Sequence, residues 1–387
     1  MSTPPRPRPQ PGLAADTGAG RAGPGQAAAA TGATDGAAEA RPAGSRRRRV
    51  TRIAQILLSL AVIAAVFAYA IPQVANYSSV WAVLRKLTWT QVGLLTAATV
   101  FNLFTYWAQL MASMPGLTLA QAAVNNQTTS SIANTMPGGG VVALGVGYRM
   151  FRSWGFSPAA IALSTILTGI WNAFLKLAMP IAAVALLALT GSHKVALLIP
   201  ALIGIAALAA TMTAFGLVVA RKRYAYRIGA ALEGIASRLL KIIRRPSVTG
   251  WGDAAVRFRR QTNDLAARRW PALTATTVVS HVGLYLVLLL CVRVVGITGT
   301  QVSWAQVLGI FSLARLLTAA PITPGGVGVV ELAYIGGLVL AGGSAIRAEA
   351  VAAVLLFRLL TYGLQIPLGA ITYPVWQRKA SWRKTAA

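Results

Sequence analysis

Long apolar stretches alternate with short polar connections over most of the chain. An apolar stretch of about 20 residues is long enough to cross the hydrocarbon core of a bilayer as a helix. The stretches of this kind predict six membrane-spanning helices, at 53–71, 91–111, 158–179 with an apolar continuation to 189, 195–220, 271–292 and 348–373. The pattern therefore predicts an all-α, polytopic integral membrane protein.

Two further apolar segments, 119–150 and 304–341, are interrupted near their centres by the same tripeptide. Pro-Gly-Gly stands at 137–139 in the first segment and at 324–326 in the second. Proline ends a helix, and glycine permits positive φ and close approach of backbone. A broken backbone survives at membrane depth only where protein buries it or where it lines a wet cavity. We therefore predict two re-entrant helical hairpins rather than two more spans.

Basic residues crowd into the segments that flank the apolar stretches. The chain carries 36 Lys+Arg against 8 Asp+Glu, a net charge of +28, although only 11% of its residues are charged. Cytoplasmic loops of membrane proteins are enriched in Lys and Arg, so the basic run at 46–49, the loop at 221–270 and the C-terminal end all belong on the cytoplasmic side. Such a charge would suggest nucleic acid in a soluble protein, but no nucleic-acid motif is present, and we predict no nucleic-acid partner.

The order of the elements gives the two broken segments opposite directions. The first follows two predicted spans, when the chain is inside, and the second follows five, when it is outside. The hairpins would thus enter from opposite faces and bring their tips together near the middle of the membrane. This is the layout of an inverted repeat, in which paired Gly/Pro-interrupted segments indicate the binding site.

Composition divides the chain into three parts. Residues 1–49 contain no aromatic residue and one Leu, too little apolar surface to fold, so they predict a disordered basic tail. Residues 50–375 form the predicted transmembrane domain, and residues 376–387 a basic cytoplasmic tail. Within the domain, the loop at 221–270 repeats apolar residues at helical spacing. Its basic amphipathic helices either lie on the anionic inner leaflet or cap the helix bundle without touching lipid.

The two breaks and a few charges inside apolar segments form the candidate site. The first turn of a helix has unpaired N–H groups that attract phosphate, and arginine binds phosphate bidentately. A charge near the bilayer centre is costly and is therefore a functional candidate. We predict a site for a phosphate or lipid headgroup that contains Pro137, Gly138, Gly139, Gly140, Arg149, Arg315, Pro324, Gly325, Gly326, Gly328, Glu331 and Arg358. The alternative is that Glu331 only ties helices together, through an ion pair with Arg358 or Arg315.

Two other ionisable side chains lie in apolar segments. We expect Lys176, near the outer end of its predicted span, to extend its ammonium group towards the interface. His281 stands alone in an apolar helix without a Cys or carboxylate cluster, so we predict no metal site. No Walker loop, dinucleotide fingerprint or G-x-S-x-G motif is present, and we predict no cofactor.

The stretches NTMPGGGVVALGVGYRM and TPGGVGVVELA, with the basic loop between them, resemble the lysylphosphatidylglycerol synthase transmembrane region family. This is the flippase-like membrane domain at the front of the bifunctional multiple peptide resistance factor. The resemblance covers about residues 53–375 and implies a phospholipid-flipping domain with re-entrant segments. Glu331 falls where the family commonly carries an acid after its second glycine motif. Only about a dozen residues follow the last predicted span, so we expect no aminoacyltransferase domain and no enzymatic activity.

Taken together, these features predict translocation of a lipid with a phosphate-bearing headgroup, such as an aminoacylated or polyprenyl lipid, between the leaflets of a bacterial inner membrane. The expected partners are that membrane phospholipid or lipid-linked substrate and the anionic inner leaflet. Two alternatives stay open. One is a secondary transporter of a small polar solute, and the other is a membrane-embedded transferase acting on a lipid phosphate, with Glu331 as its only plausible base. The sequence predicts no particular oligomeric state.

Overall fold

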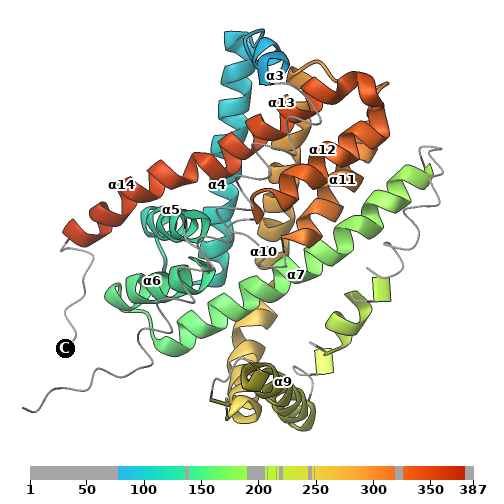
Figure 1. The fold of residues 1–387 in the computed structure, drawn as a ribbon. Helices are drawn as coiled ribbons and strands as arrows, with labels where there is room; N and C mark the ends of the chain where they lie inside the picture. The colour runs from blue at the N-terminus through green and yellow to red at the C-terminus, as the bar shows by residue number, and fades with distance from the viewer. Residues whose placement is uncertain are drawn as a thin grey trace, which may run out of the picture. The chain divides into compact units, whose positions relative to one another are not determined.

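Helices and the turns between them make up the described part of the chain, with no strand among them (Figure 1). A computed structural model describes residues 77–135, 139–189, 205–206, 208–214, 216–217, 221–242, 246–247, 249–318 and 326–379. The predicted all-α class is confirmed there. The predicted tail at 1–49, the first predicted span at 53–71 and most of the predicted span at 195–220 lie outside the described residues.

Three segments of the described chain are long and apolar enough to cross a membrane, namely Pro158–Leu189, Arg269–Val294 and Ser344–Arg378. A bent pair, α3 (Tyr77–Leu84) and α4 (Trp89–Ser113), meets the same test when its two parts, 91° apart, are taken as one span. These segments coincide with four of the six predicted spans. The other two predicted spans fall on residues that are wholly or mostly undescribed, so the number six stays a prediction.

α4 lies antiparallel to α10 (Trp251–Val294), and polar side chains join the two helices. Asn102 Nδ2 donates to the Ser280 carbonyl oxygen over 3.3 Å, and Gln109 Nε2 donates to Thr277 Oγ1 over 2.7 Å. Interhelical hydrogen bonds of this kind hold helices together in lipid, where the hydrophobic effect does not. The end of α4 therefore lies beside the first turns of the apolar part of α10, and the end of α10 lies towards the beginning of α4.

The first broken segment is a helical hairpin that follows α4. Its limbs are α5 (Leu119–Thr135) and α6 (Gly139–Ser153). The limbs run antiparallel, because Gly147 lies against Asn125 while Gly139 lies against the backbone of Ala133. At 1.5 Å per residue they are about 25 and 22 Å long, shorter than the roughly 30 Å hydrocarbon core of a bilayer.

The second broken segment is a hairpin that follows α10. Its limbs are α11 (Trp304–Leu317) and α12 (Val329–Gly342), each about 21 Å long. They are antiparallel too, since the Phe311 and Tyr334 rings stack 6.4 Å apart and Gly337 faces Ile310. Because α4 and α10 run in opposite directions, the two hairpins begin at opposite ends of that helix pair (Figure 1).

Both first limbs begin with the same capping box. Gln121 N donates to Thr118 Oγ1 and Thr118 N to Gln121 Oε1 at the start of α5, and Ser303 and Gln306 make the equivalent pair at the start of α11. We take the chain up to the end of α7 (Pro158–Leu189) as the first half and the rest as the second half. Each first limb then packs on the last helix of the other half: α5 on α14 (Gln365–Arg378), and α11 on α7. The Thr/Ser-x-Ala-Gln pattern was a second repeat signal in the sequence, beside the two Pro-Gly-Gly motifs.

Small residues let α14 approach α5 closely. A Cβ atom on Gly369 would collide with the side chain of Ser131. The hydroxyl oxygens of Thr128 and Thr372 are 3.0 Å apart, and Ser131 Oγ donates to the Ile366 carbonyl oxygen over 3.0 Å. These contacts turn part of the polar face of α5 towards protein rather than lipid, as membrane depth requires.

The last span contains a π-helical turn, Leu359–Gly363, between α13 (Arg347–Arg358) and α14. Leu364 N donates to the Leu359 carbonyl oxygen, five residues back, over 2.8 Å. Pro367 has no N–H, and the ring of a proline crowds the carbonyl four residues before it, here that of Gly363. A wider turn relieves this crowding, and π turns of this kind often occur at functional sites.

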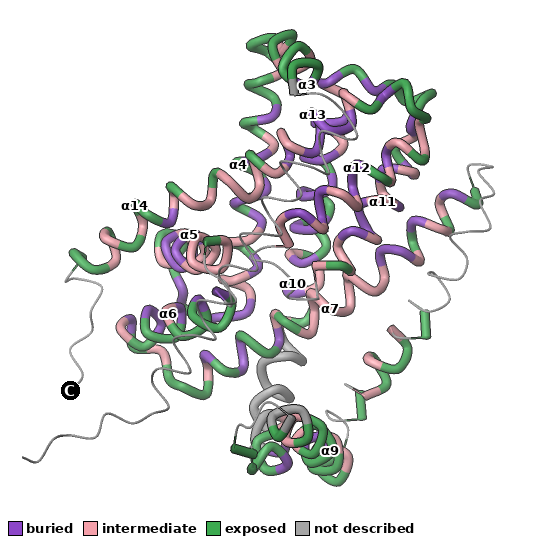
Figure 2. Tube along the Cα trace, in the orientation of Figure 1, coloured by how far each residue is buried: buried purple, intermediate pink, exposed green. Residues whose placement is uncertain are grey.

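Buried apolar side chains concentrate where α10, α11, α12 and α13 pack together (Figure 2). The basic loop differs in one respect from its prediction. α9 (Lys222–Ile242) is a separate helix, but α10 begins at Trp251 and runs without a stop through Pro271 into the apolar segment. Glu233 caps its first turn by accepting from Trp251 N over 2.8 Å. Helix therefore starts about 20 residues before the predicted span, because a proline removes one hydrogen bond while the rest of the ladder continues.

Candidate functional site

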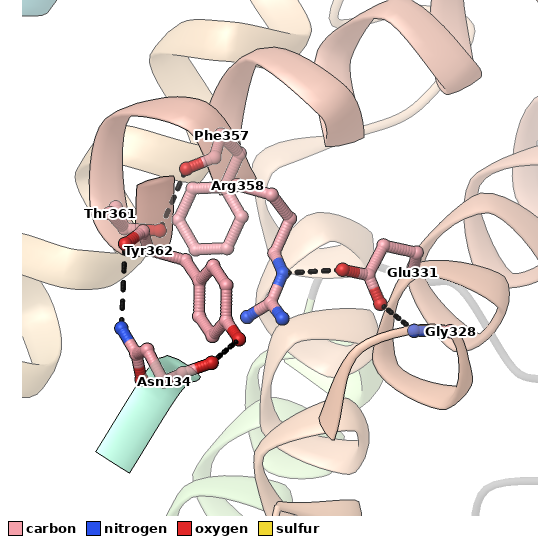
Figure 3. A network of polar contacts seen from close by, with 7 residues as sticks. All are labelled: Asn134, Gly328, Glu331, Phe357, Arg358, Thr361 and Tyr362. Carbon is pink, nitrogen blue, oxygen red and sulfur yellow. Dashed lines mark hydrogen bonds and ion pairs between the residues drawn. The ribbon is translucent and has the colours of Figure 1, made fainter. Parts of the chain in front are cut away.

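One limb of each hairpin, α5 of the first and α12 of the second, contacts the same turn of the last span (Figure 3). From the first hairpin, the Asn134 carbonyl oxygen accepts a 2.5 Å hydrogen bond from the Tyr362 hydroxyl, and Asn134 Nδ2 donates to the Tyr362 carbonyl oxygen over 3.4 Å. From the second hairpin, Glu331 pairs with Arg358. The Arg358 guanidinium lies 4.2 Å from the centre of the Tyr362 ring, a cation–π contact. An unbroken series of contacts thus links the two hairpins.

Glu331 uses both of its carboxylate oxygens inside the protein. Oε1 is 2.6 Å from Arg358 Nε, and Oε2 accepts a 2.7 Å hydrogen bond from the backbone N–H of Gly328; the residue is 2% exposed. The first turn of a helix has unpaired N–H groups and a partial positive charge. Glu331 therefore occupies the anion position at the start of α12 that the sequence assigned to a phosphate. Of the two ion pairs considered for Glu331, the structure contains the one with Arg358.

The glycines of the two motifs serve different physical needs. A Cβ on Gly139 would collide with the backbone of Ile132 and Ala133, so this glycine permits the close approach of α6 to α5. Gly326 and Gly328 have φ of +71° and +94°, a region that other residues avoid, so they permit the turn that leads into α12. The last glycine of the Pro-Gly-Gly motif thus permits close helix packing in the first hairpin, at Gly139, and a positive φ in the second, at Gly326.

A cavity of about 630 Å³ opens between α5, α6 and α7. Its walls are mostly apolar and small, and they include Gly140 beside the first break. Its polar lining consists of Asn125, Thr129 and Ser130 from α5, Tyr148 from α6, and Ser164, Thr165, Thr168 and Asn172 from α7. Leu144, an exposed apolar side chain of α6, is also part of the lining. This combination offers hydrogen bonds to a polar group and an apolar surface to a hydrocarbon chain.

The remaining predicted site residues are not all gathered at this place. Arg149 is exposed on α6, ten residues beyond Gly139 and thus about 15 Å along the helix. Arg315 lies in the last turn of α11, and neither of these arginines pairs with Glu331. Four predicted members, Pro137, Gly138, Pro324 and Gly325, lie outside the described residues.

Lys176 differs from what the sequence suggested, and His281 is buried in its predicted apolar helix. The expectation that Lys176 extends outwards from the end of its span is wrong, since α7 continues to Leu189 and Lys176 Nζ donates inwards to Thr318 Oγ1 over 3.4 Å. His281 is 3% exposed, with Nδ1 3.1 Å from the Thr277 carbonyl oxygen. Sequence reasoning missed the interactions of these two residues with other helices, because it judged each within its own helix. Among the described residues no three His, Cys, Asp or Glu side chains gather in a metal-binding arrangement.

Comparison with protein families matches residues 56–369 to the family described as "Lysylphosphatidylglycerol synthase TM region". The matched region contains both hairpins, the cavity and the Glu331–Arg358 pair. No curated protein matches the chain.

Proposed function

The chain belongs to the lysylphosphatidylglycerol synthase transmembrane region family, which makes it a multi-pass membrane protein tied to lipid metabolism or transport, and from that premise we propose that it moves a lipid with a phosphate-bearing headgroup between leaflets. An aminoacylated phospholipid and a polyprenyl phosphate both have such a headgroup. The observation that carries the proposal is the contact of both hairpins with Arg358 and Tyr362, which brings an intramembrane cation to the two breaks.

The proposed arrangement in the membrane is an inverted repeat with two re-entrant hairpins. Three observations support it: the limbs are shorter than a bilayer core, the hairpins begin at opposite ends of the α4–α10 pair, and each first limb packs on the last helix of the other half. With the basic loop on the cytoplasmic side of a bacterial inner membrane, both termini are cytoplasmic, and the first hairpin enters from the cytoplasmic side.

The cavity supplies a place for the lipid beside the first hairpin. A headgroup would contact the amide and hydroxyl groups of α5 and α7, and the acyl chains would lie along α6 and remain in the bilayer. Only the headgroup then needs a polar route, because the chains never leave hydrocarbon. Arg149, exposed on the same hairpin, would attract an anionic headgroup from the leaflet surface.

Glu331 acts in this proposal as the internal counter-ion of an empty site. It holds Arg358 and the start of α12 while no substrate is present, because an unpaired arginine at membrane depth is costly. An arriving phosphate replaces the carboxylate on Arg358, whose guanidinium group offers two parallel N–H donors. If the headgroup carries an ammonium group, the released Glu331 carboxylate can pair with it.

The test is headgroup accessibility in proteoliposomes that contain the full chain. An impermeant amine-reactive reagent reports an aminoacylated phosphatidylglycerol, and an added phosphatase reports a polyprenyl phosphate. We expect the wild type to expose inner-leaflet lipid faster than protein-free vesicles, and Glu331→Gln and Arg358→Gln to slow this at least tenfold. Arg347→Gln, an exposed cation on the same helix α13, is the matched control. Equal rates for all four proteins would contradict the proposed site, and a wild-type rate no faster than protein-free vesicles would contradict lipid transport.

A further inference from the structure

Three cationic or ionisable nitrogen side chains that are distant in sequence meet between α7, α10 and α11. Lys176 comes from α7, His281 from α10 and Arg315 from α11, and these three helices pack pairwise. Lys176 Nζ donates to Thr318 Oγ1, while Thr318 Oγ1 itself donates to the Arg315 carbonyl oxygen over 2.6 Å. Each of the three pairs of side chains interacts electrostatically, and the interaction is repulsive whenever both members of the pair are charged. We call these three residues the cation cluster.

Among the described residues, no carboxylate balances the cation cluster. The chain has eight Asp and Glu residues, of which three lie in the segment 1–49 and three in the loop 221–270. Only Glu331 and Glu349 remain, and Glu331 is already committed to Arg358. Within the described residues no carboxylate oxygen lies within 4.0 Å of a nitrogen atom of the cluster. The negative end of α11 favours one positive charge in its last turn, where Arg315 stands, but it does not balance two.

The cluster also has hydrogen-bonding atoms that nothing in the described protein uses. Arg315 Nε is buried without a partner, and so is His281 Nε2 in a side chain that is 3% exposed. Buried polar atoms are nearly always paired with protein or with an ordered ligand or water. Two unpartnered nitrogen atoms and two uncompensated positive charges form an arrangement that suits one class of ligand, an anion with several oxygen atoms.

We propose that the cation cluster of Lys176, His281 and Arg315 is a second anion-binding site, specific for the phosphate monoester group. Lys176 and Arg315 supply two positive charges, which match the charge of about −1.5 to −2 on a phosphate monoester better than the single charge of a diester. His281 Nδ1 faces the Thr277 carbonyl oxygen and therefore carries the proton in the neutral ring, which leaves Nε2 as an acceptor. These two features belong to different protonation states of the monoester: the dianion matches the two positive charges, and the monoanion, which retains one proton, offers a P–OH donor to Nε2. A diester has neither the second charge nor the P–OH group.

The cation cluster lies between the two parts of the proposed lipid route, the cavity and the Glu331–Arg358 pair. Asn172, which lines the cavity, is one helical turn before Lys176 on α7, so the two side chains share a face of that helix. At the other end, the Tyr334 ring stacks on Phe311, one helical turn before Arg315, and its other neighbour is Phe357, the residue before Arg358. A phosphate that leaves the cavity would thus meet the cation cluster before it reaches the Glu331–Arg358 pair. This role in transport rests on the proposed function, whereas the anion binding itself does not.

The experiment measures binding of radioactive inorganic phosphate to the purified full chain in detergent. The same measurement is made on the chain in nanodiscs that contain phosphatidate or phosphatidylglycerol. Lys176→Gln and Arg315→Gln remove one charge each, and Arg347→Gln is the exposed control. We expect each cluster variant to weaken phosphate binding about tenfold or more, since a charge-assisted hydrogen bond is lost, while the control binds as the wild type does. In nanodiscs, phosphatidate should compete with inorganic phosphate and phosphatidylglycerol should not.

Thermal unfolding without any anion gives a second and independent result. Lys176→Gln should unfold at a higher temperature than the wild type, because it removes a repulsive charge, whereas a lysine with a purely structural role would leave the variant less stable.

Unchanged phosphate affinity in both cluster variants would overturn the proposal. Phosphate binding that no lipid competes with would keep the anion site and assign it to the free ion. If phosphate binds as expected but no lipid is transported, the proposed function fails alone; if lipid moves and the cluster variants neither bind phosphate differently nor slow transport, the cation cluster fails alone.

Discussion

Replacing the two partners of the Glu331–Arg358 pair, singly and together, gives a measurable coupling between the second hairpin and the last span. The variants are Glu331→Gln, Arg358→Gln and the double variant. Glutamine keeps an oxygen that can accept from the Gly328 N–H, so the first variant removes the charge while it retains the cap on α12. The double variant removes both charges and leaves no uncompensated ion in the protein.

The expected magnitudes follow from burial. The Glu331 side chain is 3% exposed and that of Arg358 is 15% exposed, with 2.6 Å between the paired atoms. Removing one partner of a buried pair costs about 3–5 kcal/mol, because the other charge is left unpaired. Both residual charges keep some support, Arg358 from the Tyr362 ring and Glu331 from the Gly328 N–H, so each single variant should lose about 3 kcal/mol of unfolding free energy. The double variant should lose no more than either single variant, which is a coupling of about 3 kcal/mol.

The assay is titration of the protein with sodium dodecyl sulfate in mixed micelles, followed by tryptophan fluorescence. The chain has 10 tryptophans, which provide the signal. The control Arg347→Gln should stay within about 0.5 kcal/mol of the wild type, as exposed substitutions do. If the double variant loses the sum of the two single losses, the residues do not act as a pair, and the reasoning about an internal counter-ion is refuted.

The glycines and the tyrosine of the site give three more predictions. Gly139→Ala should reduce thermal stability and lipid transport because its Cβ meets backbone of α5, whereas Gly140→Ala, whose Cβ meets nothing, should be tolerated; equal melting temperatures would count against a closely packed first tip. Gly328→Ala should cost about 1–2 kcal/mol in the same micelle titration because φ is +94°, while Gly336→Ala, in open space within α12, should be neutral or slightly stabilising. Tyr362→Phe should cost about 1 kcal/mol by removing one hydrogen bond to the end of α5 while the ring under the arginine remains, and an unchanged unfolding free energy would show that this bond does not hold the first hairpin.

Much of the fold could be predicted because apolar stretches, proline and glycine determine local structure, which a short segment of sequence reveals on its own. The breaks near 137 and 324 were readable as hairpins, since proline and glycine dictate backbone behaviour locally. The pairing of Glu331 with Arg358 was one of two considered, and the choice between them depended on tertiary packing. The continuity of α10 was not predicted for a related reason: Pro271 was taken as the start of a span separate from the amphipathic helix before it, whereas α9 and Glu233 stabilise one helix that runs through the proline.

The cation cluster could not be predicted from any one segment. Lys176 and His281 each have apolar sequence neighbours, and only the packing of α7, α10 and α11 places them beside Arg315. A scan of the sequence for charged residues at similar depth in different predicted helices would have paired them as candidates. The scarcity of Asp and Glu after residue 270, by contrast, can be read from the sequence alone, and it indicates that few carboxylates are present to pair with cations there.

The exchange of partners between the two halves has a consequence for biogenesis. α5 enters the membrane early in synthesis, yet the hydroxyl and carbonyl groups that its Thr128 and Ser131 contact belong to α14, which the ribosome makes more than 200 residues later. Until α14 is inserted, these polar groups of the first hairpin lack their native hydrogen-bond partners. The hairpin is then incompletely folded, and water or an insertion factor must satisfy its polar surface. A nascent chain that stops short of α14 should therefore be cleared by membrane quality control, however completely its earlier helices have been inserted.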